Sequence, residues 1–196
     1  LIDAVMHAPV RTSPNPRVGC RIISNAGELI SQGIHGEAGT AHAEVIALSN
    51  AGDRARGATA IVTLEPCNHT GKTGPCVQAL LSAGISRVVF GSSDETVARG
   101  GANALRAAGI EVVSSQRQIE CDDIVAPWRH FNDTGLPYVT LKMASTLDGY
   151  VAANDGSSRW ITGEEARTFV HQLRARVDAV VVGSGTVAID DPLLDV

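Results

Sequence analysis

The sequence has no long apolar run, no excess of positive charge and no dense set of cysteines. No apolar segment approaches the ~18 residues that a membrane span needs, and no secretory signal is visible. A net charge of −5 disfavours a general nucleic-acid-binding protein, which would normally present a basic face. Hydrophobic residues make up 44% of the chain, which is enough for a folded core. We therefore expect a cytoplasmic protein that binds neither nucleic acid nor membranes.

The four cysteines do not have the spacing of a disulfide framework. Cys20 lies in a strand-like run and Cys121 in a polar helical pattern, so both are expected to be ordinary thiols in a reducing compartment. Cys67 and Cys76 differ from them, because each directly follows a proline. The chain begins at Leu1 without a methionine, so we expect its natural start to lie upstream.

The segment His42-Ala43-Glu44 and the two later Pro-Cys pairs together supply an imidazole, a carboxylate and two thiols. Zinc prefers four tetrahedral ligands, and a catalytic zinc keeps one position for water, so three protein ligands are expected. His42, Cys67 and Cys76 make three, which leaves Glu44 free to carry a proton from water to departing ammonia. H-x-E followed by P-C-x-x-C marks nucleobase deaminases, although here eight residues separate the thiols instead of two.

The spacing of His42 and Glu44 also predicts local structure. Residues two apart point to different sides in the middle of a helix, so we expect both at a first helical turn that points at the metal. Thr40 is expected to cap this helix. Pro75 fits the first position of another helix, which would place Cys76 at a positive helix end where a thiolate is favoured.

Two other interpretations remain open from these residues. In a non-catalytic zinc module, His69 would be the fourth ligand and the metal would only stabilise the fold. That interpretation gives Glu44 no role, so the pattern favours a catalytic zinc. A nucleoside or tRNA deaminase would share the zinc chemistry, but the acidic charge balance and a second region of the chain argue against it.

After an opening hairpin, strand-like runs alternate with helical patterns, which predicts an α/β layered domain with a largely parallel far half. The expected strands are 18–23, 29–30, 60–64, 87–90 and 111–113, and the expected helices are 43–51, 75–83, 101–108 and 117–125. Turn-forming residues predict a linker over 127–137, between a first domain, 1–126, and a second region, 138–196.

The second region contains the beginning of another α/β unit. A strand is expected at 138–143, a helix near 163–176 and a further strand at 179–182. Gly183-Ser184-Gly185-Thr186 follows this strand and could hold a phosphate, although a tight turn uses the same residues. The region is too short to close a normal core, so we expect an incomplete domain.

Five segments resemble the bacterial bifunctional riboflavin-biosynthesis deaminase/reductase family: 13–19, 42–44, 63–76, 141–149 and 158–162. The long spacing between Cys67 and Cys76 is typical of this family, whereas Gly74 replaces a proline that is common there. The resemblance implies a cytidine-deaminase-like three-layer αβα domain, followed by the start of a dihydrofolate-reductase-like α/β domain.

The implied reaction is zinc-dependent hydrolytic deamination of 2,5-diamino-6-(5-phosphoribosylamino)pyrimidin-4-one, a phosphorylated pyrimidine. In the intact protein, NADPH would then reduce the ribose of the product to a ribityl chain. The resemblance also implies a cytoplasmic homo-oligomer. Because the later reductase strands are absent from these 196 residues, we do not expect this chain alone to reduce the product.

The resemblance assigns roles to particular residues. Zinc ligation is placed on His42, Cys67 and Cys76, and proton transfer on Glu44. Substrate contacts in the deaminase are placed on Asn15, His35, His69 and Lys72; a lysine between glycines also suits a phosphate. In the reductase part, NADPH contacts are placed on Ala144, Trp160, Thr186 and Asp190, and substrate contacts on Ser158, Arg174 and Leu194.

Overall fold

A computed structural model describes residues 1–71 and 73–195 of the chain. The chain divides into two compact units, Leu1–Tyr138 and Val139–Val196. Each unit is described by itself below. None of the described helices combines the length and apolar character that crossing a bilayer requires.

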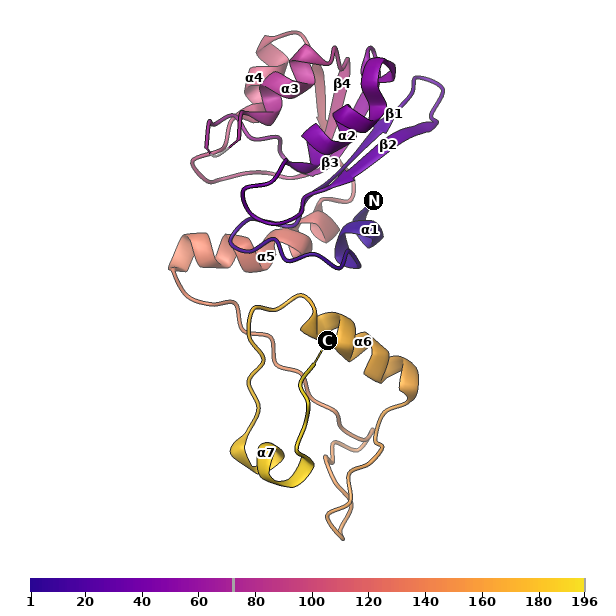
Figure 1. Ribbon diagram of the computed structural model, residues 1–196, viewed down its shortest axis with the longest axis vertical. Helices are drawn as coiled ribbons and strands as arrows, with labels where there is room; N and C mark the ends of the chain where they lie inside the picture. The colour runs from indigo at the N-terminus through magenta and orange to yellow at the C-terminus, as the bar shows by residue number, and fades with distance from the viewer. Residues whose placement is uncertain (72, 196) are drawn as a thin grey trace. The chain divides into compact units, whose positions relative to one another are not determined.

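A mixed sheet forms the centre of the first unit (Figure 1). Within the described residues, its strands are β1 (Gly19–Ile23), β2 (Leu29–Ile34), β3 (Thr59–Leu64), β4 (Arg87–Ser92) and β5 (Glu111–Ser114), in the order β2-β1-β3-β4-β5. β1 is antiparallel to both β2 and β3, whereas β3, β4 and β5 are parallel. Parallel neighbours need crossover connections, which the helices between them supply. The predicted hairpin followed by a parallel half is confirmed.

Helices cover the sheet as two groups. The helices of this unit are α1 (Ile2–Met6), α2 (Ala43–Ala51), α3 (Cys76–Ser82), α4 (Gly101–Ala107) and α5 (Gln118–Thr134), with a short 3-10 helix, η1 (Gly52–Ala55). α2 contacts α3 and α3 contacts α4, whereas α1 contacts α5. The two groups lie apart in Figure 1.

Sheet register shows that the two groups occupy opposite faces. Paired residues on neighbouring strands point to the same face, and one such row is Gly33, Cys20, Val62 and Phe90. A Cβ at Gly33 would collide with the backbone of α2, so α2 lies directly on this face. A Cβ at Gly91, which points the opposite way from Phe90, would collide with Cys121 of α5. The first unit is therefore a three-layer αβα sandwich, as predicted.

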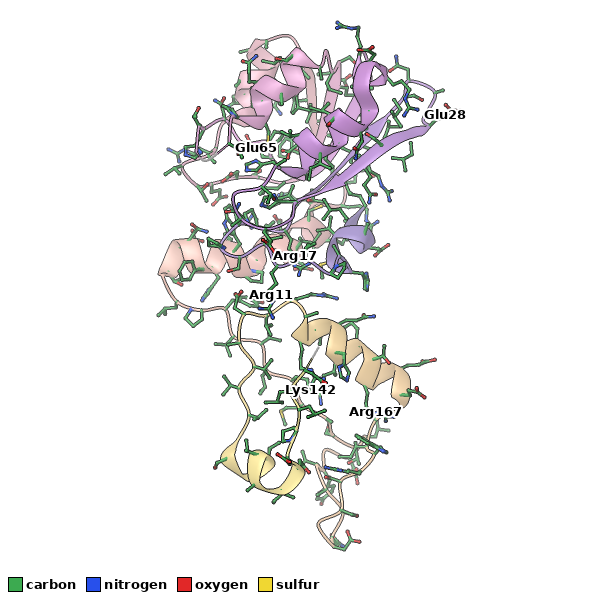
Figure 2. All side chains as sticks on the ribbon, in the orientation of Figure 1. Arg11, Arg17, Glu28, Glu65, Lys142 and Arg167 are labelled. Atoms are coloured by element: carbon green, nitrogen blue, oxygen red, sulfur yellow. The ribbon has the colours of Figure 1, made fainter. Side chains whose placement is uncertain are left out.

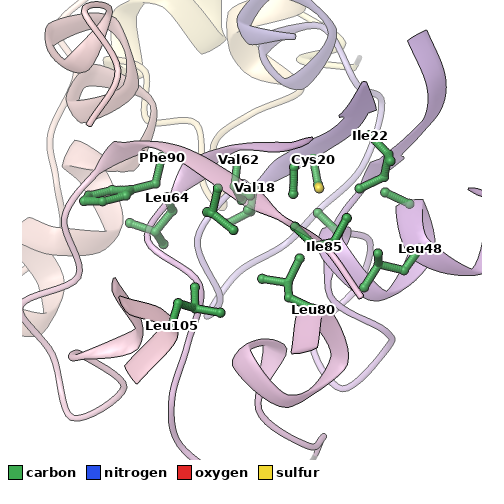
Figure 3. Close-up of a cluster of buried hydrophobic side chains, with 14 of the residues drawn as sticks. Val18, Cys20, Ile22, Leu48, Val62, Leu64, Leu80, Ile85, Phe90 and Leu105 are labelled. Carbon is green, nitrogen blue, oxygen red and sulfur yellow. The ribbon is translucent and has the colours of Figure 1, made fainter. Parts of the chain in front are cut away.

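Most of the core residues labelled in Figure 3 lie between the sheet and α2, α3 and α4, and Val5 of α1 and Val125 of α5 belong to the same buried cluster. Removal of these apolar side chains from water is the main stabilising contribution to such a layer. The residues labelled in Figure 3 are all at most 9% exposed: Val18, Cys20, Ile22, Leu48, Val62, Leu64, Leu80, Ile85, Phe90 and Leu105. Cys20 and Cys121 are buried free thiols.

α5 is longer than the sequence pattern predicts. We expected a helix over 117–125 and a linker from Pro127, but the helix continues to Thr134 with Pro127 inside it. An internal proline removes a helical hydrogen bond, and contacts with the sheet offset that cost. Arg129 donates to the Ser92 hydroxyl and lies 3.3 Å from Asp122, and the Ser92 hydroxyl donates to Asp122.

The second unit contains α6 (Glu164–Arg174) and α7 (Ser184–Asp190). The helix expected near 163–176 is present, but the strands expected at 138–143 and 179–182 are not formed in the described residues. Leu141 and Val181, in the middle of these runs, are 80% and 92% exposed. A strand requires a neighbour to take its backbone hydrogen bonds, and β propensity alone does not supply one.

Candidate metal centre and active site

The first unit brings the three predicted metal ligands together at the point where β3 ends and two helices begin. His42 is the N-cap of α2, Cys67 lies just after β3, and Cys76 is the first residue of α3. His42 Nδ1 lies 3.1 Å from Cys76 Sγ and 3.5 Å from Cys67 Sγ. All three potential ligand atoms lie within 4.8 Å of one another. The carboxyl ends of parallel strands are the usual place for a ligand site in an α/β sheet.

This donor set fits zinc. One imidazole nitrogen and two thiolates are ligands that zinc prefers, whereas magnesium and calcium prefer oxygen. Ordinary zinc bond lengths and tetrahedral angles put a ligand nitrogen and a ligand sulfur about 3.5 Å apart, close to the two observed separations. The described part of the chain adds no further His, Cys, Asp or Glu to the cluster. His69, the fourth ligand of the non-catalytic interpretation, is exposed and outside it.

Glu44 is buried beside this cluster. It occupies the first turn of α2 and is only 3% exposed. Burial, together with a smaller effect of the Cys67 thiolate charge, raises the pKa of its carboxyl to about 6. A buried carboxyl with a raised pKa next to potential metal ligands suits proton transfer near neutral pH.

Two details of helix capping differ from the predictions. Thr40 does not cap α2, because its hydroxyl donates to the Glu37 carbonyl instead and the extended residue His42 is the N-cap. Pro75 is the N-cap of α3 rather than its first residue, so Cys76 occupies the first helical position. Both potential ligands therefore lie at helix starts. The N-cap of α2 lies two residues after the expected Thr40, and α3 begins one residue later than expected.

The two thiols differ in protonation. The Cys67 sulfur accepts hydrogen bonds from the Cys76 thiol and the Cys76 backbone N–H and lies 3.5 Å from His42 Nδ1, and these contacts lower the pKa of Cys67 to about 4. The same shared proton, together with burial, raises the pKa of Cys76 above its usual range. Without a cation, Cys67 is the thiolate and Cys76 keeps its proton.

Asn15 and His35 form a pair next to the metal ligands. His35 is 3% exposed, and its Nδ1 lies 3.1 Å from the Ala41 carbonyl oxygen, so Nδ1 carries the proton. Its Nε2 then accepts a hydrogen bond from the Asn15 amide nitrogen, 3.0 Å away. Burial lowers the pKa of His35 and favours this neutral form. The ring centroids of His35 and His42 are 5.3 Å apart in an edge-to-face arrangement.

Comparison with known proteins shows what the chain resembles. Residues 2–92 match the cytidine and deoxycytidylate deaminase zinc-binding region, and residues 137–196 match the RibD C-terminal domain. Riboflavin biosynthesis protein RibD of Corynebacterium ammoniagenes is 50% identical over 184 residues, which cover 93% of this chain and 55% of that protein. The chain is similar to RibD proteins along nearly its whole length.

Solved structures agree with this assignment. The deaminase/reductase of Thermotoga maritima is 39% identical, with a TM-score of 0.85 over 97% of this chain and 55% of that one. RibD of Acinetobacter baumannii, form 1, is 43% identical, with a TM-score of 0.80 over 98% and 55% of the two chains. The chain spans about half the length of the curated RibD relatives that it matches. The predicted family resemblance, fold class and zinc-binding deaminase region are confirmed.

Two further deaminase residues, His69 and Lys72, were predicted to contact the substrate. His69 is an exposed residue of the segment that joins the two thiols. Lys72 lies outside the described residues. Among the four residues expected to contact the substrate in this domain, the described structure brings Asn15 and His35 together beside the potential ligands.

Sequence reasoning missed Glu65 (Figure 2). Its carboxylate is 9% exposed and accepts hydrogen bonds from the backbone N–H groups of Asp94, 3.2 Å away, and of Ala102, 2.8 Å away. Ala102 lies in the first turn of α4, so Glu65 ties the segment that carries Cys67 to a neighbouring helix. An acidic residue directly before Pro-Cys at the end of a strand was the available signal.

In the second unit, no side-chain hydrogen bond or ion pair recorded among the described residues joins the predicted reductase residues to one another. An ion pair of 2.9 Å between Arg159 and Asp190 links the 158–160 segment to α7. Trp160 is 70% exposed, with the Arg167 guanidinium 4.4 Å from its ring centroid. Arg174 contacts His171 within α6. Of the others, Ser158 and Thr186 are exposed, and Ala144 and Leu194 are half-buried.

Proposed function

We propose that this chain is a zinc-dependent deaminase of 2,5-diamino-6-(5-phosphoribosylamino)pyrimidin-4-one. His42, Cys67 and Cys76 would hold the metal, and Glu44 would move the protons. One observation carries this proposal: the carboxyl of Glu44 is buried beside a cluster of three potential zinc ligands. Three protein ligands leave one tetrahedral position for water, which is the arrangement of catalytic zinc.

The mechanism requires a nucleophile and a proton carrier. When bound, zinc would lower the pKa of a coordinated water to about 7. The Glu44 carboxylate would take the proton that the attacking water loses. A carbon–oxygen bond then forms at the ring carbon that bears the amino group, and the carbon–nitrogen bond breaks as Glu44 returns the proton to the leaving nitrogen. Water and the amino-pyrimidine become the oxo product and ammonia.

Recognition of the substrate would use the Asn15–His35 pair. Because the Asn15 amide nitrogen donates to neutral His35, its amide oxygen is left to accept from an amino or ring N–H group of the pyrimidine. Lys72 would provide a positive charge for the phosphate, and His69, in the same insertion between the two thiols, would also contact the substrate.

The experiment that tests this function is ammonia release by the 196-residue chain loaded with zinc. Three substrates are compared: the phosphorylated diaminopyrimidinone, cytidine and a tRNA. We expect release only from the pyrimidinone, with a mass increase of one unit in the product as NH is replaced by O. Turnover of cytidine or tRNA with no turnover of the pyrimidinone would overturn the substrate assignment.

We also propose that residues 138–196 are the N-terminal part of an NADPH-dependent reductase domain, joined to a deaminase domain, 1–126, through residues 127–137, which include the last turns of α5. The match of residues 137–196 to the RibD C-terminal domain supports this division. In the intact protein, NADPH would contact Ala144, Trp160, Thr186 and Asp190, and the product would contact Ser158, Arg174 and Leu194. We further propose a cytoplasmic homo-oligomer, which sedimentation of the purified protein would test.

A further inference from the structure

The two ring nitrogens of His42 have different neighbours. Nδ1 faces the sulfurs of Cys67 and Cys76, as described above. Nε2 lies 3.2 Å from the Thr73 hydroxyl oxygen, on the segment that joins the two thiols. A neutral imidazole carries one proton, so it can offer the Nδ1 lone pair to a metal only when that proton is on Nε2. The Thr73 oxygen is placed to accept this proton.

The position of the Thr73 hydroxyl is set by its surroundings. Thr73 is half-buried and lines the same cavity as Ala41 and Val45, so it lies beside the start of α2. Its backbone carbonyl accepts a hydrogen bond from the Gly71 N–H, 3.2 Å away. Three residues later the chain reaches Cys76, so one short segment brings both a sulfur ligand and this hydroxyl to the centre.

We infer that Thr73 is a positioning residue for His42. Its hydroxyl accepts the Nε2–H hydrogen bond, fixes the tautomer and the plane of the ring, and so directs Nδ1 to the metal. This inference rests on the zinc centre proposed above and adds a residue that does not itself bind the metal. Partners of this kind raise the basicity of a ligating histidine, and their loss typically weakens metal affinity about 10- to 100-fold.

The chain offers a matched control within the same segment. Thr70 is exposed and lies outside the metal cluster, so Thr70→Val makes the same chemical change without touching His42. Thr73→Val keeps the shape of the side chain and removes the hydroxyl. Thr73→Ser restores the hydroxyl with one methyl group fewer.

The test is the zinc dissociation constant of the 196-residue chain, measured by competition with a chromophoric chelator at one fixed pH. We expect Thr73→Val to bind zinc about 10- to 100-fold more weakly than wild type. Thr73→Ser and Thr70→Val should remain within about threefold of wild type, because both keep the hydroxyl beside His42. The melting temperature of the metal-free protein should not change, since the inferred role concerns a ligand rather than the core.

The outcomes separate this inference from the proposed function. If wild type binds zinc and Thr73→Val binds it with the same affinity, the role of Thr73 is overturned while the proposed function stands. The same conclusion follows if Thr70→Val loses as much zinc affinity as Thr73→Val. A wild-type chain that binds no zinc would overturn both. If Thr73→Val lowers the melting temperature of the metal-free protein, the comparison moves to Thr73→Ser and Thr73→Ala, where equal zinc affinities would contradict the inference.

Discussion

The backbone N–H of Cys76 donates a hydrogen bond to the sulfur of Cys67, 3.4 Å away. The start of α3 therefore carries the Cys76 thiol and also stabilises negative charge on the sulfur of Cys67. This stabilisation adds to the larger effect of the proton shared by the two thiols, which lowers the pKa of Cys67 and raises that of Cys76, so that Cys67 holds the charge and Cys76 keeps the proton. A divalent cation bound between them would displace that proton.

Zinc affinity should therefore rise with pH. The pKa of Cys67 is lowered to about 4, so its thiolate is present throughout the neutral range, whereas the raised pKa of Cys76 means that its proton must be lost on binding. We expect proton release on zinc addition in weakly buffered solution, and tighter binding at pH 8 than at pH 6. Affinity that is constant between these two pH values would contradict this assignment.

Replacing Glu44 by Gln should separate metal binding from turnover. The amide keeps the shape of the side chain but cannot carry the proton, so deamination should fall by about 10²- to 10⁴-fold with zinc content unchanged. Cys67→Ala should lose the metal itself. Ammonia release and zinc content are measured on the same samples. Exposed Glu37 provides the control, because Glu37→Gln should leave both quantities as in wild type. Near-normal turnover by Glu44→Gln would refute the proton-transfer role.

Glu44→Gln should also stabilise the metal-free protein at high pH. Burial raises the pKa of Glu44 from 4.5 to about 6. The folded protein is therefore more stable when Glu44 is protonated than when it is ionised. The stability that this group contributes is complete below pH 4.5 and is lost as pH rises through 6. At pH 8, Glu44→Gln should increase the free energy of unfolding by up to about 2 kcal/mol. Urea titrations with chelator at pH 8 and pH 4.5 should show a gain only at the higher pH.

Glu65→Gln should loosen the segment that carries Cys67. Each carboxylate oxygen accepts one backbone N–H, from Asp94 and from Ala102, and an amide would place its own NH2 group against one of these donors. We expect a loss of about 1–3 kcal/mol in the free energy of unfolding, together with faster release of zinc to a chelator. Glu28, exposed at the β1–β2 turn, is the matched control (Figure 2). Equal effects of Glu28→Gln and Glu65→Gln would show that Glu65 does not anchor the segment that carries Cys67.

Several features were readable from short stretches of sequence. The helix expected at 43–51 coincides with α2, and the central strand expected at 60–64 differs from β3 by one residue. The three potential zinc ligands and Glu44 were selected by residue type and order, because few side chains can bind zinc and fewer can move a proton beside it. Structural comparison confirms the fold class that these patterns predicted.

Other features depended on contacts that no local pattern contains. Pro127 lies inside α5 because Arg129 and Asp122 bind the sheet through Ser92, and this offsets the cost of the proline. The apolar runs at 138–143 and 179–182 form no strand in the described residues, because a strand needs a neighbour as well as propensity.

The amino-acid sequence by itself determined the chemistry available to this protein: an imidazole, two thiols and a carboxyl in an order that suits a deaminase. Only the tertiary structure decided which atoms meet. The choice of Nδ1 rather than Nε2 of His42, the position of Thr73 and the anchoring of Glu65 on α4 all follow from distances between segments remote along the chain. Residue type limits which bonds a side chain can form, whereas packing of the layers determines the partners it finds.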